Sequence, residues 1–383
     1  MKPTEQQNLI LDYDGNSVVI AAPGSGKTFV LSQKIKRNLK SLLDYQGVVA
    51  ISYTNKASNE LKNRSLSNGE KPQGSFFGTI DKFNLSEIII PFAKHLFGIP
   101  KNEIKIIKYS SLSDDEQDEF GCVDRNLTLE QLDEKKANSI QEYFNKGLIL
   151  IETIGVFADY VFTKSIACQK YIKAKYKYIY IDEYQDSGYE QHQIFKKIKE
   201  LDLLAIAVGD LNQSIYAFSG KDSKYLQELT KDDSFKYFKL DKNHRCHSSI
   251  INYSNYLLNP KTELIPVENN QIYFSRINGD EIAIAKWIDK KISSIQKIFK
   301  VNNRNQIAIL ARGNRTAEIL NNNLDSLHRL FVSNELDINL NISRDVKSLY
   351  HGFDSYDLVP SAVNNVVLSG KFIKISNNKT YIF

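Results

Sequence analysis

Cysteine is scarce in this sequence, and the scarcity excludes two kinds of structure. The three cysteines lie far apart among the 383 residues, at Cys122, Cys168 and Cys246. They therefore exclude a disulfide framework and a CxxC metal site. No stretch approaches the roughly 18–20 consecutive apolar residues that cross a bilayer, and the N-terminus lacks the apolar core of a signal peptide. We therefore expect a cytosolic protein that has no membrane partner.

Arginine and net charge are also limited. Only 10 of the 50 basic residues are arginine, so any arginine near a reaction centre is of interest, because its planar fork suits phosphate. The net charge of +5 permits a nucleic-acid partner without requiring one. The composition, 42% apolar and 25% charged, is that of a folded globular protein, and the length suits one very large domain or two to three ordinary ones.

Short apolar runs alternate with helical segments in the first 85 residues, and two further apolar runs follow after residue 174. This alternation is typical of a parallel α/β sheet. In between, the chain looks helical and carries an acidic run at residues 114–119, for which we expect a solvated loop. We expect strands at 18–22, 48–53, 76–78, 178–182 and 204–208, and helices at 28–42 and 55–64.

The expected organisation has three parts. They are a first α/β lobe at residues 1–84 and 175–240, an inserted helical subdomain at 85–174, and a second lobe at 241–383. After about residue 334 the patterns weaken. Within the second lobe, apolar periodicity predicts a strand at 306–311, a helix at 315–330, and a helix at 282–298 that buries Trp287 in the core.

The strongest local pattern is a glycine-rich turn between an apolar strand and a helix. Such a turn is typical of a P-loop, in which the flexible glycines allow successive N–H groups to point at phosphate oxygens. Lys27 would reach the β- and γ-phosphates of ATP, and the Thr28 hydroxyl would bind Mg²⁺. The alternative is a turn that binds nothing. The residues concerned are Ala21, Ala22, Pro23, Gly24, Ser25, Gly26, Lys27 and Thr28.

A magnesium site of this kind also needs a carboxylate at the end of a strand. Asp182 ends the apolar run at 178–182 and would hold Mg²⁺, and Glu183 would accept a proton from the attacking water. The alternative is an acidic strand-to-loop junction of the kind that occurs in any α/β protein. Gln213 follows the run at 204–208 and is the candidate sensor of the γ-phosphate.

Seven segments share the order and spacing of known helicase motifs: residues 4–7, 21–28, 52–57, 77–79, 182–186, 209–216 and 243–245. Through them the chain resembles UvrD/Rep-type superfamily-one DNA helicases. The resemblance implies a RecA-like P-loop NTPase sheet with an inserted helical subdomain and a partial second RecA-like lobe. Within the family, residues 77–92 and 181–187 are most similar to the helicase-like subunit of the Gabija anti-phage defence system.

The resemblance also implies roles in nucleotide binding. Gln7, with Gln6 as a near-equal candidate, would recognise the adenine edge. Arg245 would reach the γ-phosphate from the second lobe, and Phe29 and His244, although both depart from the family pattern, would still sandwich the base.

The resemblance further implies a track for single-stranded DNA, to which Gln213 would couple the γ-phosphate. Such tracks combine backbone charge with aromatic stacking on bases. The candidate DNA-binding residues are Thr54, Asn55, Thr79, Phe83, Tyr216 and Phe218.

Two departures from the family matter. The later motifs, including one with a second catalytic arginine, are not found in residues 334–383. Such an arginine contributes roughly 10³–10⁵ in rate, so we expect weak turnover unless a partner completes the cleft. Phe29 and His244 replace a basic and an aromatic residue, which leaves the nucleotide preference open. A zinc site at His244, Cys246 and His247 is a competing hypothesis that lacks further ligands nearby.

Three hypotheses for function remain. The first is an ATP- and Mg²⁺-dependent, DNA-stimulated ATPase of the 3′→5′ helicase class that acts in bacterial anti-phage defence. The second is a subunit that senses ATP and DNA and regulates a nuclease partner, with little or no unwinding. The third is an inactive truncated fragment, whose open sheet edge would promote aggregation. In the first two cases the substrate is single-stranded or partly duplex DNA.

Overall fold

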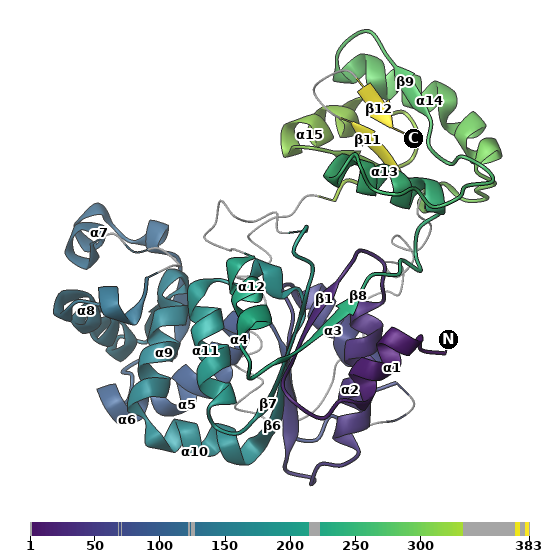
Figure 1. The fold of residues 1–383 in the computed structure, drawn as a ribbon. Coiled ribbons are helices and arrows are strands. Elements are labelled where there is room, and N and C mark those ends of the chain that lie inside the picture. Colours follow the sequence, from purple (N-terminus) through teal and green to yellow (C-terminus); the bar gives the residue numbers. More distant parts are fainter. Residues whose placement is uncertain are drawn as a thin grey trace. The chain divides into compact units, whose positions relative to one another are not determined.

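The computed structural model describes residues 2–67, 69, 71–121, 123, 127–213 and 223–331, together with the backbone of residues 372–375 and 380–382. The described residues form two compact units, one up to Lys242 and the other from Asn243 onward. Each unit is built around a sheet of its own (Figure 1). Within this described part, no helix is both long and apolar enough to cross a membrane.

All six strands of the main sheet in the first unit run parallel, in the order β3-β2-β6-β7-β1-β8. The predicted parallel sheet is therefore confirmed, and β8 is an edge strand that the apolar patterns did not predict. Parallel strands end at a common edge, so the loops after β1, β6 and β7 converge there. The strands are β1 (Ser17–Ala21), β2 (Gly47–Ile51), β3 (Phe76–Gly78), β6 (Tyr176–Ile181), β7 (Leu204–Gly209) and β8 (Lys236–Leu240).

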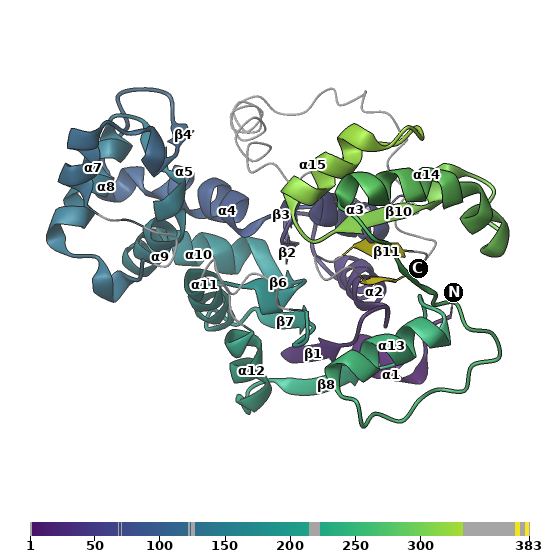
Figure 2. The ribbon, with the colours of Figure 1, turned by 90° about the horizontal axis from the view of Figure 1, so that it is seen from above.

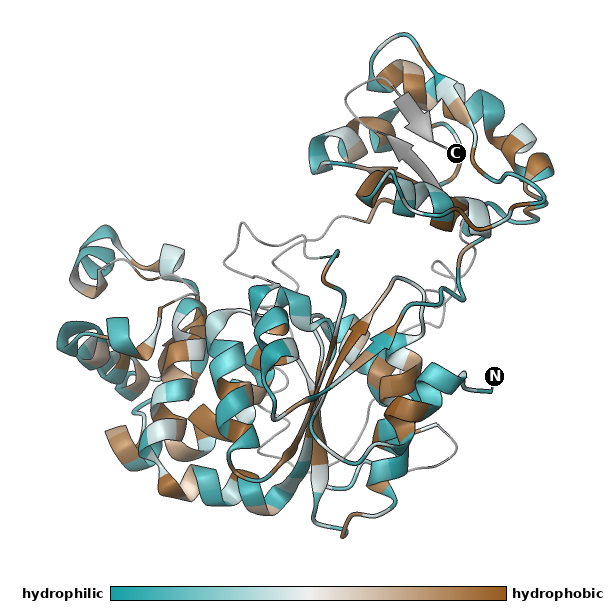
Figure 3. Cartoon of the chain, in the orientation of Figure 1, coloured by the Kyte–Doolittle hydropathy of each residue, from teal (hydrophilic) through white to brown (hydrophobic). Residues whose placement is uncertain are grey.

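Helices cover both faces of this sheet (Figure 2). Val19 belongs to the core beneath α1 (Glu5–Asp12), α2 (Lys27–Leu39) and α3 (Asn55–Ser65). Its neighbour Val18 belongs to the opposite core, beneath α10 (Ile166–Lys175), α11 (Tyr189–Lys199) and α12 (Lys224–Lys231). Successive side chains of a strand point to opposite faces, and both faces here are buried. The inner strands β2 and β7 are therefore apolar throughout, whereas the edge strand β8 carries two lysines. Figure 3 shows the middle of this sheet in the brown of hydrophobic residues.

Between β3 and β6 the chain is mainly helical, as expected (Figure 1). The insertion also contains one pair of parallel strands, β4 and β5. A π-helical segment, Asn84–Ile89, joins its first two helices. The elements are α4 (Ile80–Phe83), α5 (Ile90–Phe92), α6 (Lys94–Phe97), β4 (Lys105–Ile107), α7 (Asp114–Phe120), α8 (Glu134–Asn145), β5 (Leu148–Leu150) and α9 (Ile154–Lys164).

The acidic run at residues 114–119 is a helix, so the predicted loop is wrong. It belongs to α7, which begins with a capping box: the Ser113 hydroxyl accepts from the Glu116 N–H, and the Glu116 carboxylate accepts from the Ser113 N–H. The Ser113 N–H and hydroxyl both donate to the Glu116 carboxylate, and these two hydrogen bonds lower its pKa. Three acidic residues in the first turn also complement the positive end of the helix dipole. The capping serine, and not the charge run alone, decides the local structure.

The described residues of the second unit form the helices α13, α14 and α15 and a sheet of order β10-β11-β12-β9, in which β10 and β11 are parallel. Trp287 is partly buried against the small core between α14 and α15, in agreement with its predicted core position. The elements are α13 (Ser248–Leu258), β9 (Phe274–Arg276), α14 (Glu281–Ile298), β10 (Ala308–Ala311), α15 (Asn314–Asn323), β11 (Phe372–Ile375) and β12 (Thr380–Ile382).

The helix predicted at residues 315–330 ends early, at Asn323. The next residue, Leu324, is extended, with φ −87° and ψ 122°. The Asp289 carboxylate accepts hydrogen bonds from the N–H groups of Asp325 and Ser326, at 2.8 and 3.0 Å. These tertiary hydrogen bonds replace the next helical turn, so apolar periodicity over-predicted the length of the helix.

His192 on α11 lies in a buried polar cluster. It is 2% exposed, and its Nδ1 and Nε2 lie 2.9 Å from Tyr184 Oη and 3.3 Å from Glu228 Oε2. Its ring stacks on that of Tyr225. Burial lowers the pKa of His192 to about 4, helped by the charge of Lys196 and opposed by Glu228. The imidazole is therefore neutral in the folded protein at neutral pH.

We expect His192 to make the protein sensitive to mild acid. An unfolded histidine takes up a proton near pH 6.5, so its contribution to stability is complete above that pH. This contribution is lost as the pH falls towards 4, and the free energy of unfolding then decreases by up to about 3 kcal/mol. In urea titrations at pH 7.5, 6 and 5, His192→Gln should flatten this dependence, and the exposed His95→Gln should not. Equal pH dependence of the two variants would contradict the prediction.

Candidate nucleotide-binding site

The loop between β1 and α2 has the backbone of an anion-binding turn. Gly24 and Gly26 have φ values of +70° and +89°, in the left-handed region that glycine enters without steric cost. Gly26 is the N-cap of α2 and supplies no capping side chain. The buried Ser25 hydroxyl has no hydrogen-bond partner among the described residues. An anion at the N-terminus of α2 would meet free donors and the positive end of the dipole.

Two pairs of side chains join this loop to the end of β6. Lys27 Nζ lies 3.1 Å from Glu183 Oε2, and Thr28 Oγ1 lies 3.5 Å from Asp182 Oδ2. The partners are 156 and 154 positions apart in the sequence. The sheet brings them together because β1 and β6 end at the same edge. The four residues predicted to hold phosphate, magnesium and water therefore lie in one place.

Asp182 is placed where a lone carboxylate is unfavourable. It is 5% exposed. Burial, followed by the negative charge of Glu183, raises its pKa to about 7, and the positive charge of Lys27 acts in the opposite direction. A divalent cation beside the carboxylate would remove this penalty. The Thr28 hydroxyl and the Asp182 carboxylate both offer oxygen atoms, the ligands that Mg²⁺ prefers. The residues present therefore fit a magnesium ion.

Glu183 has a strained backbone. Its φ of 54° and ψ of 45° lie in the left-handed helical region, which is uncommon for residues other than glycine. Such a conformation costs of order 1–3 kcal/mol and clusters at functional sites. The Glu183 N–H donates to Asp182 Oδ1 at 3.0 Å, which links the two carboxylate residues. This strain supports the predicted role of Glu183 as the proton acceptor.

The two glutamines of α1 have different surroundings. Gln7 is 5% exposed. Its Oε1 accepts from the Thr4 N–H and its Nε2 donates to the Ser25 carbonyl, both at 3.0 Å. In this structure the Gln7 amide holds the phosphate loop, and its role in recognising adenine stays a prediction. Gln6, the second candidate, is half-buried and donates to Asp241 Oδ1 at 2.9 Å, and its role in base recognition also stays a prediction.

Substitution of the two glutamines is expected to separate base recognition from phosphate binding. Each neutral hydrogen bond contributes about 0.5–1.5 kcal/mol, or roughly 2- to 12-fold in affinity. Gln6→Ala should weaken ATP binding by such a factor and leave GTP binding unchanged. Gln7→Ala should weaken the binding of ATP and of GTP equally. Titration of both variants with both nucleotides measures this. If Gln7→Ala instead lowers the affinity for ATP and not that for GTP, Gln7 is the residue that recognises adenine.

The candidate sensor Gln213 is anchored at the end of β7. Its Nε2 donates to Asp210 Oδ2 at 2.7 Å. The Asp210 N–H in turn donates to Gln185 Oε1 at 2.9 Å, and Gln185 Nε2 donates to Glu183 Oε2 at 2.8 Å. No role was predicted for Gln185 from the sequence, where it was evident only as a member of the motif at residues 182–186.

The candidate DNA-binding residues have different positions. Thr54 and Thr79 are the N-caps of α3 and α4, and their hydroxyls accept from backbone N–H groups. Asn55 follows Thr54 and is half-buried. The prediction for Phe83 is wrong, because its ring is 0% exposed and packs 5.3 Å from the Phe76 ring in the core. The other two candidates, Tyr216 and Phe218, lie outside the described residues.

The Asn-x-Arg motif lies at the start of the second unit. The N–H groups of Arg245 and Cys246 donate to Asn243 Oδ1, at 2.8 and 2.9 Å, and form a tight polar turn. His244 and Arg245 are exposed, whereas Phe29 packs at the margin of the α1–α2 core. The base sandwich and the role of Arg245 stay predictions. Within the described residues, no group of three or more metal-binding side chains occurs.

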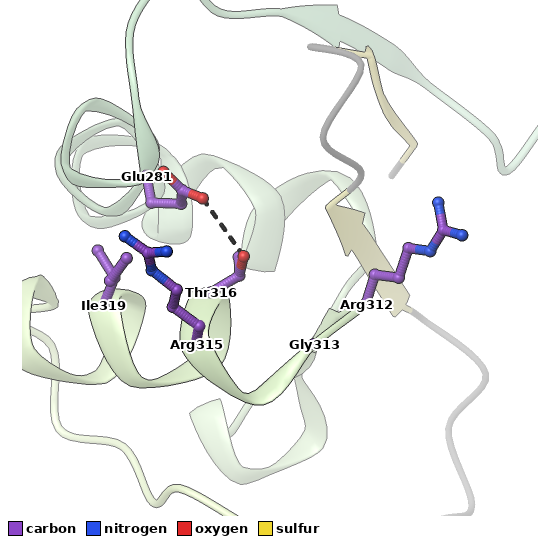
Figure 4. A pocket seen from close by; sticks show the side chains of 6 residues that line it. All are labelled: Glu281, Arg312, Gly313, Arg315, Thr316 and Ile319. Carbon is purple, nitrogen blue, oxygen red and sulfur yellow. Dashed lines mark hydrogen bonds between the residues drawn. The ribbon is translucent and has the colours of Figure 1, made fainter.

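The second unit has a pocket of its own at the start of α15 (Figure 4). The Thr316 hydroxyl donates to Glu281 Oε1 at 3.3 Å, and Figure 4 shows Arg315 on the same side, with Arg312 extended away from this pair. Neither arginine belongs to a recognisable sequence motif: Arg312 directly follows β10, and Arg315 lies in the first turn of α15. The pocket, of about 480 Å³, is lined by Glu281, Arg312, Gly313, Arg315, Thr316 and Ile319.

The first unit matches a known protein family. The model described as "UvrD/REP helicase N-terminal domain" matches residues 2–154 and 128–234. The two matched ranges include the phosphate loop, the Asp182–Glu183 pair and Gln213. They therefore cover all the first-unit side chains described above as candidates for binding a nucleotide.

Individual relatives are similar over a larger part of the chain. The Gabija protein GajB of Bacillus cereus is 30% identical, over 81% of this chain and 60% of its own length. A probable DNA helicase II homolog of Rickettsia conorii is 26% identical, over 80% of this chain and 53% of its own length. The ATP-dependent DNA helicase PcrA of Staphylococcus epidermidis is 25% identical, over 83% of this chain and 48% of its own length. The chain thus spans about half to three fifths of the length of these relatives.

Among solved structures, the Pif1 helicase from Candida albicans is 13% identical, with a TM-score of 0.37 over 69% of this chain and 45% of that chain. This similarity is too low to establish a shared fold.

Proposed function

Because the chain belongs to the UvrD/REP helicase family, we propose that it is an ATP- and Mg²⁺-dependent ATPase that DNA stimulates. We propose further that it belongs to the 3′→5′ class of DNA helicases and acts in bacterial anti-phage defence, in the cytoplasm. The similarity to Gabija protein GajB supports the defence role.

One observation carries the proposal. A lysine and a threonine from the phosphate loop meet two carboxylates from the end of β6, at 3.1 and 3.5 Å. Either half alone is common in α/β proteins. A loop suited to phosphate beside a buried carboxylate that favours a cation is the arrangement that binds a nucleoside triphosphate with its metal.

The chemistry assigns one task to each group. Thr28 and Asp182 would hold Mg²⁺, which supplies positive charge to the phosphates. Lys27 would leave Glu183 and bind the β- and γ-phosphates, because a polyphosphate carries more negative charge than one carboxylate. Glu183, released from the ion pair, would accept a proton from the water that attacks the γ-phosphate. The lysine therefore keeps the base occupied until the substrate arrives.

The remaining residues would couple hydrolysis to DNA. We propose that Gln213 senses the γ-phosphate and that Arg245 reaches it from the second lobe. Gln6 would bind the adenine edge between Phe29 and His244. The DNA track would use Thr54, Asn55, Thr79, Tyr216 and Phe218. The lobes would be residues 1–84 with 175–240, the insertion 85–174 and the second lobe 241–383.

The test is a calorimetric titration of the full chain with ATP and Mg²⁺, followed by phosphate release with and without single-stranded DNA. We expect heat that depends on Mg²⁺ and hydrolysis that DNA increases. Folded protein that gives no heat with ATP and Mg²⁺ overturns the proposed function. Strand displacement on substrates with a 3′ or a 5′ single-stranded tail then determines polarity.

A second candidate function is favoured by the similarity to a Gabija protein, because the helicase-like member of that defence system is a subunit. The chain would then sense ATP and DNA and regulate a nuclease subunit, with little unwinding by itself. Fast strand displacement by the chain alone would exclude this version. ATP hydrolysis without displacement, restored by a nuclease partner, would support it.

A further inference from the structure

Gln185 lies in the turn between β6 and α11 and is 2% exposed. Both ends of its amide are used. The Nε2 donates to Glu183 Oε2 at 2.8 Å, and the Oε1 accepts from the Asp210 N–H at 2.9 Å. The side chain thus connects the end of β6 with the end of the neighbouring strand β7.

These contacts require an amide. The Glu183 carboxylate needs a donor and the Asp210 N–H needs an acceptor, and a glutamine side chain supplies both at the correct length. A second residue makes room for it: a Cβ on Gly209 would lie 2.7 Å from Gln185 Oε1. Glycine at this strand end therefore permits a close approach that any larger residue would block. One position in the turn after β6 and one at the end of β7 are therefore fitted to the same contact.

The hydrogen bonds continue beyond Asp210. Its Oδ2 accepts from Gln213 Nε2 at 2.7 Å, and its Oδ1 accepts from the Asn212 N–H at 3.0 Å. An unbroken series of hydrogen bonds therefore runs from Glu183 through Gln185 and Asp210 to Gln213. A shift of Gln213 towards a bound phosphate would be transmitted to the Glu183 carboxylate by contact.

We propose that Gln185 is a positioning residue for ATP hydrolysis, which holds the Glu183 carboxylate and ties its orientation to the position of Gln213. The inference rests on the proposed function. Lys27 and Gln185 both contact Glu183 Oε2 in this structure. Once phosphates take Lys27, Gln185 is the contact that keeps the carboxylate oriented. Loss of orientation at a reacting group costs on the order of 10²-fold in rate.

The first variant is Gln185→Met, which has a similar length and supplies no comparable donor or acceptor. We expect the kcat for ATP to fall by about 10- to 100-fold, while the KM and the calorimetric ATP affinity stay within about threefold. The matched control is Gln169→Met, at a half-buried glutamine whose amide bonds the Phe162 carbonyl. A Gln185→Met protein that keeps the parent kcat overturns the proposal.

The second variant, Gln185→Glu, keeps an acceptor for the Asp210 N–H and replaces the donor with a negative charge. Its kcat should fall at least as far, even though it retains the link to β7. If Gln185→Met fails to fold, Gln185→Glu still decides the matter, because a folded variant with parent kcat overturns the proposal.

A double-mutant cycle separates this role from a merely structural one. Gln185 and Gln213 act through one series of contacts, so the effects of Gln185→Met and Gln213→Ala on kcat should be less than additive. Additive effects would overturn the link to the sensor. A parent protein that neither binds nor hydrolyses ATP would overturn the proposed function itself. If the parent hydrolyses ATP and Gln185→Met does so equally well, only the role of Gln185 is overturned.

Discussion

Replacement of Glu183 by glutamine is expected to lower ATP hydrolysis by about 10²- to 10⁴-fold, the contribution of a positioned general base. The amide has the size of the carboxylate and cannot accept a proton from water. ATP binding should stay equal or become tighter, because Lys27 loses the ion pair that holds it at 3.1 Å. Phosphate release and calorimetric titration of the same sample measure both quantities.

The matched control is Glu200→Gln, which makes the same chemical change at an exposed position of the first unit. It should leave hydrolysis and binding unchanged. Parent-like hydrolysis in Glu183→Gln would remove Glu183 from the role of proton acceptor. A loss of binding in that variant would show instead that the carboxylate supports the loop.

Lys27→Ala is expected to have the larger effect on binding. A hydrogen bond to a charged group contributes about 1.5–3 kcal/mol, so ATP should bind about 10- to 100-fold more weakly. Hydrolysis should fall by a further factor of about 10² or more, because the lysine charge also stabilises the transferring phosphoryl group. The rise in melting temperature that ATP causes in the parent should shrink accordingly.

Lys36→Ala is the control for this experiment, since Lys36 lies on the same helix and its ammonium bonds only the Ser67 carbonyl among the contacts described. It should bind and hydrolyse ATP like the parent. Robust turnover by Lys27→Ala would refute the assignment of the phosphate loop. A cooperative thermal transition in the parent, raised by ATP, would also argue against the hypothesis of an inactive fragment.

The two variants test a single physical idea about the resting site. Lys27 and Glu183 neutralise each other when no nucleotide is present, and Asp182 bears an unfavourable buried charge beside them. A triphosphate would take Lys27 from Glu183, and its metal would offset the buried charge of Asp182. The site is therefore stable without substrate and becomes reactive through the exchange of one ion pair for another.

Some features follow from residues that are close together in the chain. The phosphate loop is one, because the left-handed conformations of Gly24 and Gly26 and the start of the following helix are encoded within a few positions. The parallel sheet is another, because strands buried on both faces must be continuously apolar. The Asp182–Glu183 pair was also evident, since carboxylates directly after such a strand lie at the edge where the loops meet.

Other features were settled only by contacts between distant segments. Two adjacent glutamines look alike in sequence, and only the packing of α1 places the Gln7 amide on the Ser25 carbonyl and the Gln6 amide on Asp241. The buried ring of Phe83 and the bridging amide of Gln185 depend in the same way on neighbours from other strands. Local patterns encode backbone preference and burial, whereas the partner of a given side chain depends on which remote segments the fold brings beside it.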